Sequence, residues 1–198
     1  MLFPAPSPPP ALRPGPALHL LTREEFMGRQ HLVEATIQSQ LRYFDAVLPP
    51  AWREMEATLA SDRPRNLVTR FELAPLEGYQ LMLFPPHHMD HGLVVALAPD
   101  GAVAGMARQG LGLAVHPEHR GKGLATELML TAYTTGLKHA EEGLPLSAGG
   151  YATLVAVHRL AVRRAWEAGE HLRPEVLEDY PELTAATANS LPQDTPEP

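Results

Sequence analysis

The chain has 198 residues, of which 44% are hydrophobic, and this composition is typical of one soluble globular domain with a sizeable core. The sequence has no cysteine, which excludes disulfides, thiolate metal sites and a cysteine nucleophile and is compatible with a reducing cytosol. The net charge of −7 argues against a general nucleic-acid binder, and no apolar run approaches the roughly 20 residues of a membrane span.

The first elements follow a proline-rich start. Seven prolines occupy residues 1–16, which we expect to be a disordered tail without a secretory signal. Residues 18–21 then predict a short strand. A capping-box pattern at residues 22–25 predicts a helix whose apolar face continues to about Phe44. A second, shorter helix is predicted over residues 50–59.

Two β-prone segments, residues 67–73 and 79–84, predict the next strands. The loop after them, residues 85–91, holds three histidines and an aspartate. Two of these histidines are adjacent, so their side chains point apart on an extended chain, and no second cluster completes a coordination sphere. We therefore predict no metal site. Asp90 and His91 in this loop are candidates for accepting a proton from a substrate.

A β-hairpin is predicted over residues 92–108, with Asp100 and Gly101 as its turn. Another strand follows at residues 111–115. A helix then begins at Gly123 and is expected to reach about His139, because its apolar residues recur at helical spacing.

The segment that joins this strand to the helix carries the most informative motif. It reads Val115-x-Pro117 followed by Arg120-x-x-Gly123-x-Ala125, so a strand leads through a glycine-rich turn into a helix. The unpaired amides of a first helical turn and the helix dipole favour phosphate binding, and glycines let an anion approach the backbone. Neither the Walker pattern nor the dinucleotide fingerprint fits. The motif resembles the acyl-CoA-binding motif of the GNAT N-acetyltransferase superfamily, most closely over residues 92–140.

The resemblance implies that acetyl-CoA binds at this turn as a cosubstrate. Backbone amides would hold its pyrophosphate, and strand 111–115 would pair with its pantetheine arm. The implied cofactor-binding residues are Leu113, Ala114, Val115, Arg120, Gly121, Lys122, Gly123, Leu124 and Ala125. The resemblance also implies an α/β fold over residues 17–183, a GNAT-like mixed, mostly antiparallel central sheet with helices on both faces.

The C-terminal part departs from the family pattern and is expected to be simplified. Residues 144–150 are too broken to predict a strand, a helix is predicted over residues 151–169, and a short helix starts at Pro174 and ends at residues 180–181. The family's two closing strands have no counterpart, and residues 184–198 read as a disordered tail. The long helix carries Tyr151 and His158, although apolar neighbours favour His158 as a core histidine.

The expected function is transfer of an acetyl group from acetyl-CoA to a primary amine, on a small molecule or a peptide, by direct attack in a ternary complex. The candidate bases are Asp90, His91 and His116, with Glu72 as a further one, and the candidate acids are Tyr151 and His158. The alternative is an acyl-CoA-binding regulatory or partner module with little or no catalysis, and a third reading is a purely structural turn. We expect a cytoplasmic protein without a membrane or nucleic-acid partner, and the sequence allows a homodimer.

Overall fold

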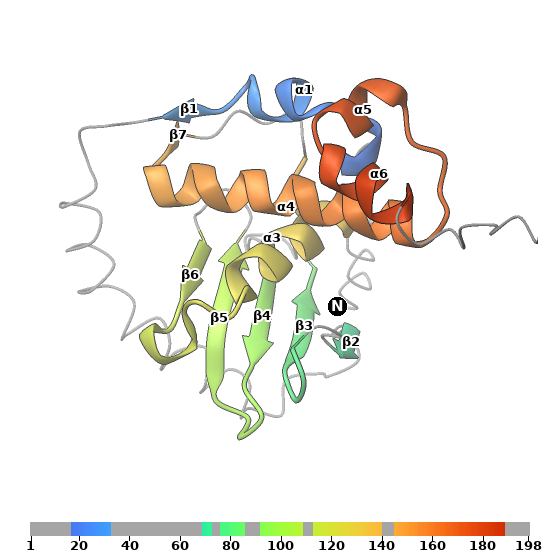
Figure 1. Cartoon of the computed structure of the whole chain (residues 1–198). Coiled ribbons are helices and arrows are strands. Elements are labelled where there is room, and N and C mark those ends of the chain that lie inside the picture. The colour runs from blue at the N-terminus through green and yellow to red at the C-terminus, as the bar shows by residue number, and fades with distance from the viewer. Residues whose placement is uncertain are drawn as a thin grey trace, which may run out of the picture.

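The structure is a computed structural model in which residues 17–32, 69–72, 76–85, 92–108, 113–139 and 145–188 are described. At its centre lies a five-stranded sheet with the strand order β2-β3-β4-β5-β6 (Figure 1). Every neighbouring pair in it is antiparallel, which confirms the α/β class with a mostly antiparallel central sheet. The strands are β2 Thr69–Glu72, β3 Gln80–Phe84, β4 Leu93–Leu97, β5 Val103–Arg108 and β6 Leu113–Val115.

The β4–β5 hairpin turns where the sequence predicts. Gly101 has a φ of 87°, in the left-handed region that glycine enters without a steric cost. Asp100 supports the turn, because its Oδ1 accepts a hydrogen bond from the Ala102 N–H at 3.0 Å. The Asp-Gly pair therefore shapes the turn that pairs β4 with β5.

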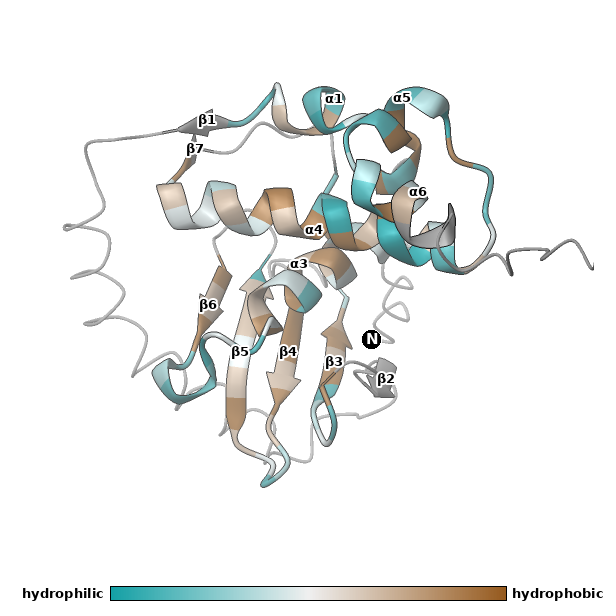
Figure 2. Cartoon of the chain, in the orientation of Figure 1, coloured by the Kyte–Doolittle hydropathy of each residue, from teal (hydrophilic) through white to brown (hydrophobic). Residues whose placement is uncertain are grey.

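Helix α3 (Leu124–Thr134) covers one face of the sheet, and helix α4 (Ala148–Glu167) packs against α3 (Figure 1). Gly105 in β5 allows α3 to come close, since a Cβ at this position would lie 2.8 Å from Leu128 Cδ1. Buried side chains of the sheet, α3 and α4 form the main core, and β3, β4 and β6 are coloured as largely hydrophobic in Figure 2. The turn before α3 therefore joins two elements that are packed in the fold, strand β6 and helix α3.

The other face of the sheet is apolar as well. Leu93, Val95 and Val103 are buried there, with Phe84 and Met106 packed against them. A sheet that is apolar on both faces is typical of one covered on both sides, as the family resemblance implies.

The N-terminal segment differs from the prediction. Residues 18–21 were expected to form a strand, but Leu18–Leu20 form the 3₁₀ helix η1, and the Leu21 N–H donates to Leu18 O. The capping box is confirmed at the start of α1 (Arg23–Met27). This helix ends at Gly28, and β1 (His31–Leu32) already pairs in parallel with β7 (Pro145–Leu146). The prediction of one helix to Phe44 is therefore wrong over the described residues, and the helix over residues 50–59 lies outside them.

Helix ends in the C-terminal half also shift. Helix α3 ends at Thr134 and not near His139, because Gly136 turns into the left-handed region with a φ of 76°. Helix α4 starts at Ala148, where the Ser147 side chain accepts a hydrogen bond from the Gly150 N–H and caps it.

Two short helices, α5 (Pro174–Glu178) and α6 (Pro181–Ala188), follow α4. Between α4 and residue 188 the described chain forms no strand. Two expectations for this part are wrong: Pro145–Leu146 form β7 where no strand was predicted, and α6 extends to Ala188 although residues 184–198 were expected to be a disordered tail. None of the described helices is both long and apolar enough to cross a membrane.

Candidate functional site

The turn between β6 and α3 is built from a 3₁₀ turn, η4 (Pro117–His119), followed by residues 120–123. Gly121 and Gly123 have φ values of 77° and 81°, a backbone conformation that side chains other than glycine rarely adopt. A Cβ at either glycine would meet nothing within 4 Å. The glycines are therefore needed for backbone shape, and the space beside them is open.

The amides of this turn form a cluster of free donors. The Arg120 N–H donates to Pro117 O, and the Glu127 N–H is the first to donate back into the helix, to Gly123 O. Between these two bonds, amides 121–126 have no acceptor among the described residues, and no side chain caps α3. Because these amides point out of a helix N-terminus, an anion placed there would accept several of them.

Two cationic side chains flank the turn. Arg120 Nε donates to Val115 O at 3.0 Å, which holds the guanidinium at the end of β6. Lys122 Nζ donates to the Tyr79 hydroxyl at 3.2 Å and lies 5.8 Å from the centre of that ring. Both cations are exposed, so they add positive charge next to the free amides.

Strand β6 forms an edge of the described sheet. Its register with β5 pairs Met106 with Ala114, and the His116 N–H donates to Ala104 O. Hydrogen-bonding groups alternate along an antiparallel strand, so the N–H of Ala114 also faces β5 while those of Leu113 and Val115 face outward. The outward N–H groups of Leu113 and Val115 are therefore the ones that this edge can offer to a ligand.

Tyr79 and His119 join the site although neither was predicted as a site residue. The Tyr79 hydroxyl and His119 Nδ1 lie 2.8 Å apart, and Tyr79 is 7% exposed. His116 and His119 are close as well, with ring centres 5.8 Å apart. The His-x-x-His spacing within a proline turn was a readable signal, whereas the contact with Tyr79 joins residues 40 positions apart.

The structure describes some of the candidate bases and not others. His116 follows β6 directly and is half-buried at the start of η4. Asp90 and His91 lie outside the described residues, as does the rest of the loop over residues 86–91. Glu72 ends β2, with only its backbone described.

The candidate acids both lie on α4. His158 is fully buried, with Nδ1 2.7 Å from the Tyr180 hydroxyl and Nε2 2.9 Å from Leu21 O, so the core-histidine reading is confirmed. Burial is the main cause that lowers the pKa of His158 below its usual value. With both ring nitrogens bonded inside the protein, His158 has no free group to offer a substrate. Tyr151 is 37% exposed in the first turns of α4.

Comparison with known families supplies an independent finding. Residues 52–147 match the model of the acetyltransferase (GNAT) family. This span contains the five-stranded sheet, the glycine turn and α3. The comparisons with curated proteins and with solved structures found no match.

Proposed function

Through residues 52–147 the chain belongs to the GNAT acetyltransferase family, and we propose that it transfers an acetyl group from acetyl-CoA to a primary amine. One observation carries the proposal. An edge strand leads into a turn whose amides 121–126 have no acceptor in the described part of the chain. The free amides can donate hydrogen bonds to a pyrophosphate. The strand beside them is an edge strand, so its outward hydrogen-bonding groups can pair with the rest of the cofactor.

The cofactor would lie along β6 and end at the turn. Amides from Gly121 to Ala125 would hold the pyrophosphate, with Arg120 and Lys122 adding positive charge. The outward N–H groups of Leu113 and Val115 would pair with the amides of the pantetheine arm. Acetyl-CoA supplies the activated thioester, and the protein supplies its orientation.

Direct attack sets three requirements on the residues around the thioester. The amine nitrogen forms a bond to the carbonyl carbon, and an ammonium with a pKa of about 10 must first lose a proton to a base. The carbonyl oxygen gains negative charge, which a backbone N–H of strand 111–115 that does not pair with the pantetheine arm would stabilise. The carbon–sulfur bond then breaks. A thiol with a pKa of about 8.5 leaves as the thiolate with little help from an acid. The mechanism therefore does not require His158 as an acid.

His116 follows Val115 directly, so it stands between β6 and the turn that would hold the pyrophosphate. The pantetheine arm would carry the thioester away from this end of β6, so the position of His116 does not favour it as the base. Asp90 and His91 stay candidates on their sequence position.

A second function is an acyl-CoA-binding module without catalysis. The sequence of β6, Leu113-Ala114-Val115, supports it, because the strand offers no carboxylate beside the thioester. The two functions share the cofactor site and differ in turnover.

The experiment that separates them is a thiol-release assay with acetyl-CoA and a panel of primary amines and basic peptides. We expect release above background with at least one acceptor, at a rate that rises with pH through about 6 to 8 as the base and the amine lose protons. A protein that binds acetyl-CoA but releases no thiol with any acceptor would instead be the binding module.

A further inference from the structure

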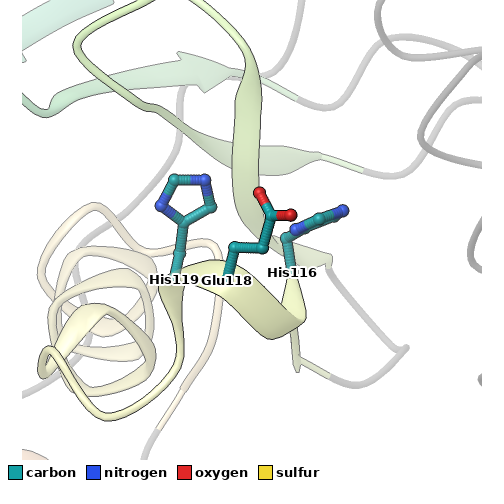
Figure 3. A group of neighbouring side chains, drawn as sticks. All are labelled: His116, Glu118 and His119. Carbon is teal, nitrogen blue, oxygen red and sulfur yellow. The ribbon is translucent and has the colours of Figure 1, made fainter.

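Three side chains with metal-binding atoms stand together on η4. His116, Glu118 and His119 each offer one ligand atom, and these atoms all lie within 4.8 Å of one another. Figure 3 shows the three side chains rising from the same side of the turn. Such a set of two imidazoles and a carboxylate, with room for a fourth ligand, suits a zinc-class ion.

The turn itself brings the ligands together. Side chains three residues apart eclipse in a 3₁₀ turn, which places His116 and His119 on one side. Pro117 occupies the first position of η4, and the His119 N–H donates to His116 O at 2.9 Å. Both features fix the backbone between the two histidines, so the ligand spacing is largely set before any ion binds.

Tyr79 orients one ligand from another part of the fold. Its hydroxyl lies 2.8 Å from His119 Nδ1, and Tyr79 itself is nearly buried. A hydrogen bond at Nδ1 holds the imidazole ring and leaves Nε2 as the nitrogen that faces outward, which is the usual support for a metal-binding histidine.

The charges around the group have opposite effects. Lys122 Nζ donates to the same Tyr79 hydroxyl at 3.2 Å, and this cation disfavours a second positive charge nearby. The Glu118 carboxylate, as a ligand, offsets that repulsion directly. Glu118 is exposed and both histidines are half-buried, so small side-chain rotations bring the ligand atoms to the roughly 3.4 Å separation of a tetrahedral zinc site.

We propose that His116, Glu118 and His119 bind one zinc-class divalent cation, with water as the fourth ligand. Its ligands are other residues than the histidines of the loop over residues 85–91, for which the sequence predicts no metal binding. The proposal stands without the acetyl-transfer function, because the ligands and their support are protein groups alone.

The test uses the full-length, metal-stripped protein and zinc in calorimetry, with cobalt absorption spectra as a report of four-coordinate geometry. We expect one equivalent of zinc to bind, and His119→Asn or Glu118→Gln to weaken it at least about tenfold. His171→Asn is the matched control, since this histidine is exposed and lies between α4 and α5, not in η4. It should bind zinc as the unmodified protein does.

A second variant removes the competing histidines, with His87, His88 and His91 all changed to Asn. Zinc binding should persist in this variant, and thermal midpoints should show that every variant is folded. Loss of zinc binding in the loop variant, or unchanged binding in His119→Asn and Glu118→Gln, would overturn the proposal. So would the absence of stoichiometric binding to the unmodified protein.

Discussion

His158 is the most constrained polar residue in the described core. One of its ring nitrogens contacts Leu21 O in the N-terminal segment, and the other contacts the Tyr180 hydroxyl near the C-terminus. Its ring also stacks against Phe26, with ring centres 5.5 Å apart. A single side chain thereby joins three parts of the chain.

We expect His158→Phe to lower the free energy of unfolding by about 1–3 kcal/mol, because Tyr180 and Leu21 lose a buried hydrogen-bond partner. The measurement is urea unfolding near neutral pH, with His171→Asn as an exposed control. A variant as stable as the unmodified protein would show that the two hydrogen bonds contribute nothing net.

The pH dependence follows from the lowered pKa of His158. Burial favours the neutral ring in the folded state, so the unfolded state takes up a proton first as the pH falls below about 6.5. Stability from His158 is therefore complete above that pH and is lost as the pH falls towards the folded-state pKa. Unfolding experiments at about pH 7.5 and about pH 5.5 should show a larger loss on acidification in the unmodified protein than in His158→Phe. Equal losses would contradict this.

Asp90 and His91, in the loop over residues 85–91, are the candidates that the sequence offers for the base that the reaction needs. Changing both to Asn should lower kcat by about a hundredfold or more while acetyl-CoA affinity stays the same, which is the signature of a group that acts in the transition state. Steady-state rates with a responsive amine, together with binding calorimetry, provide the check. Unchanged turnover would show that neither Asp90 nor His91 is the base.

At the scale of elements, α3 and α4 are joined by an ion pair beside the main core. Arg164 Nη2 donates to Glu127 Oε1 at 2.7 Å, and the Glu127 side chain is 6% exposed against 42% for Arg164. Burial raises the pKa of the Glu127 carboxyl, and the nearby guanidinium of Arg164 acts in the opposite direction. The buried Glu127 carboxylate therefore needs the ion pair to stay charged more than the exposed Arg164 guanidinium does.

We predict that Arg164→Met destabilises the fold by about 1–3 kcal/mol, because it leaves a buried carboxylate without its cation. The double variant Glu127→Met/Arg164→Met should recover much of that loss, since replacing both members of a buried pair is often nearly neutral. Denaturant unfolding of the two single variants and the double variant measures the cycle. A double variant less stable than Arg164→Met would contradict the account of the pair.

Elements with local signals could be predicted from the sequence. The capping box at residues 22–25 and the turn at Asp100 and Gly101 each depend on contacts within a few residues, and both form as expected. Pro181 shows where such local prediction fails, because proline is common both just after a helix and at the first position of one. The sequence was interpreted as a helix end there, and the structure starts α6 at that residue.

Contacts between residues that are far apart in the chain could not be predicted from the sequence. The apolar spacing after residue 26 fits a long helix, and nothing local shows that residues 31–32 pair with residues 145–146 instead. In the site, the glycine turn was predictable from its spacing. The partners Tyr79 and His119 were not, because tertiary packing brings them together.

At the scale of the molecule, the N-terminal and C-terminal segments meet at the end of α4 away from the glycine turn (Figure 1). Exposed ion pairs link them, Arg23 with Asp179 and Glu25 with Arg173, and such pairs contribute little on their own. Most of the stabilisation there comes from a second buried cluster, which consists of Val162, Ala165, Leu172, Val176 and Tyr180.

A chain that ends at residue 169 should therefore melt earlier than the full chain. The truncation removes the buried side chains Leu172, Val176 and Tyr180. Each costs about 1.5–3 kcal/mol, and each kcal/mol corresponds to about 2 °C or more, so we expect a loss of at least about 9 °C. A chain that ends at residue 188 is the matched control and should melt near the full-length midpoint. An unchanged midpoint for the shorter chain would mean that α5 and α6 do not stabilise the domain.

The central claim is that amides 121–126 hold the pyrophosphate of acetyl-CoA, and calorimetry on Gly123→Asp tests it most directly. The new carboxylate would stand at the start of α3, where it competes with phosphate for the free amides and repels it. Gly101→Asp is the matched control, because this glycine also has a positive φ and open space around its Cα but lies at the hairpin tip. We predict that Gly123→Asp lowers acetyl-CoA affinity by about a hundredfold, the loss of one or two charge-assisted hydrogen bonds, while Gly101→Asp leaves it unchanged. Equal affinities in the two variants, both folded, would contradict the assignment of this turn as the cofactor site.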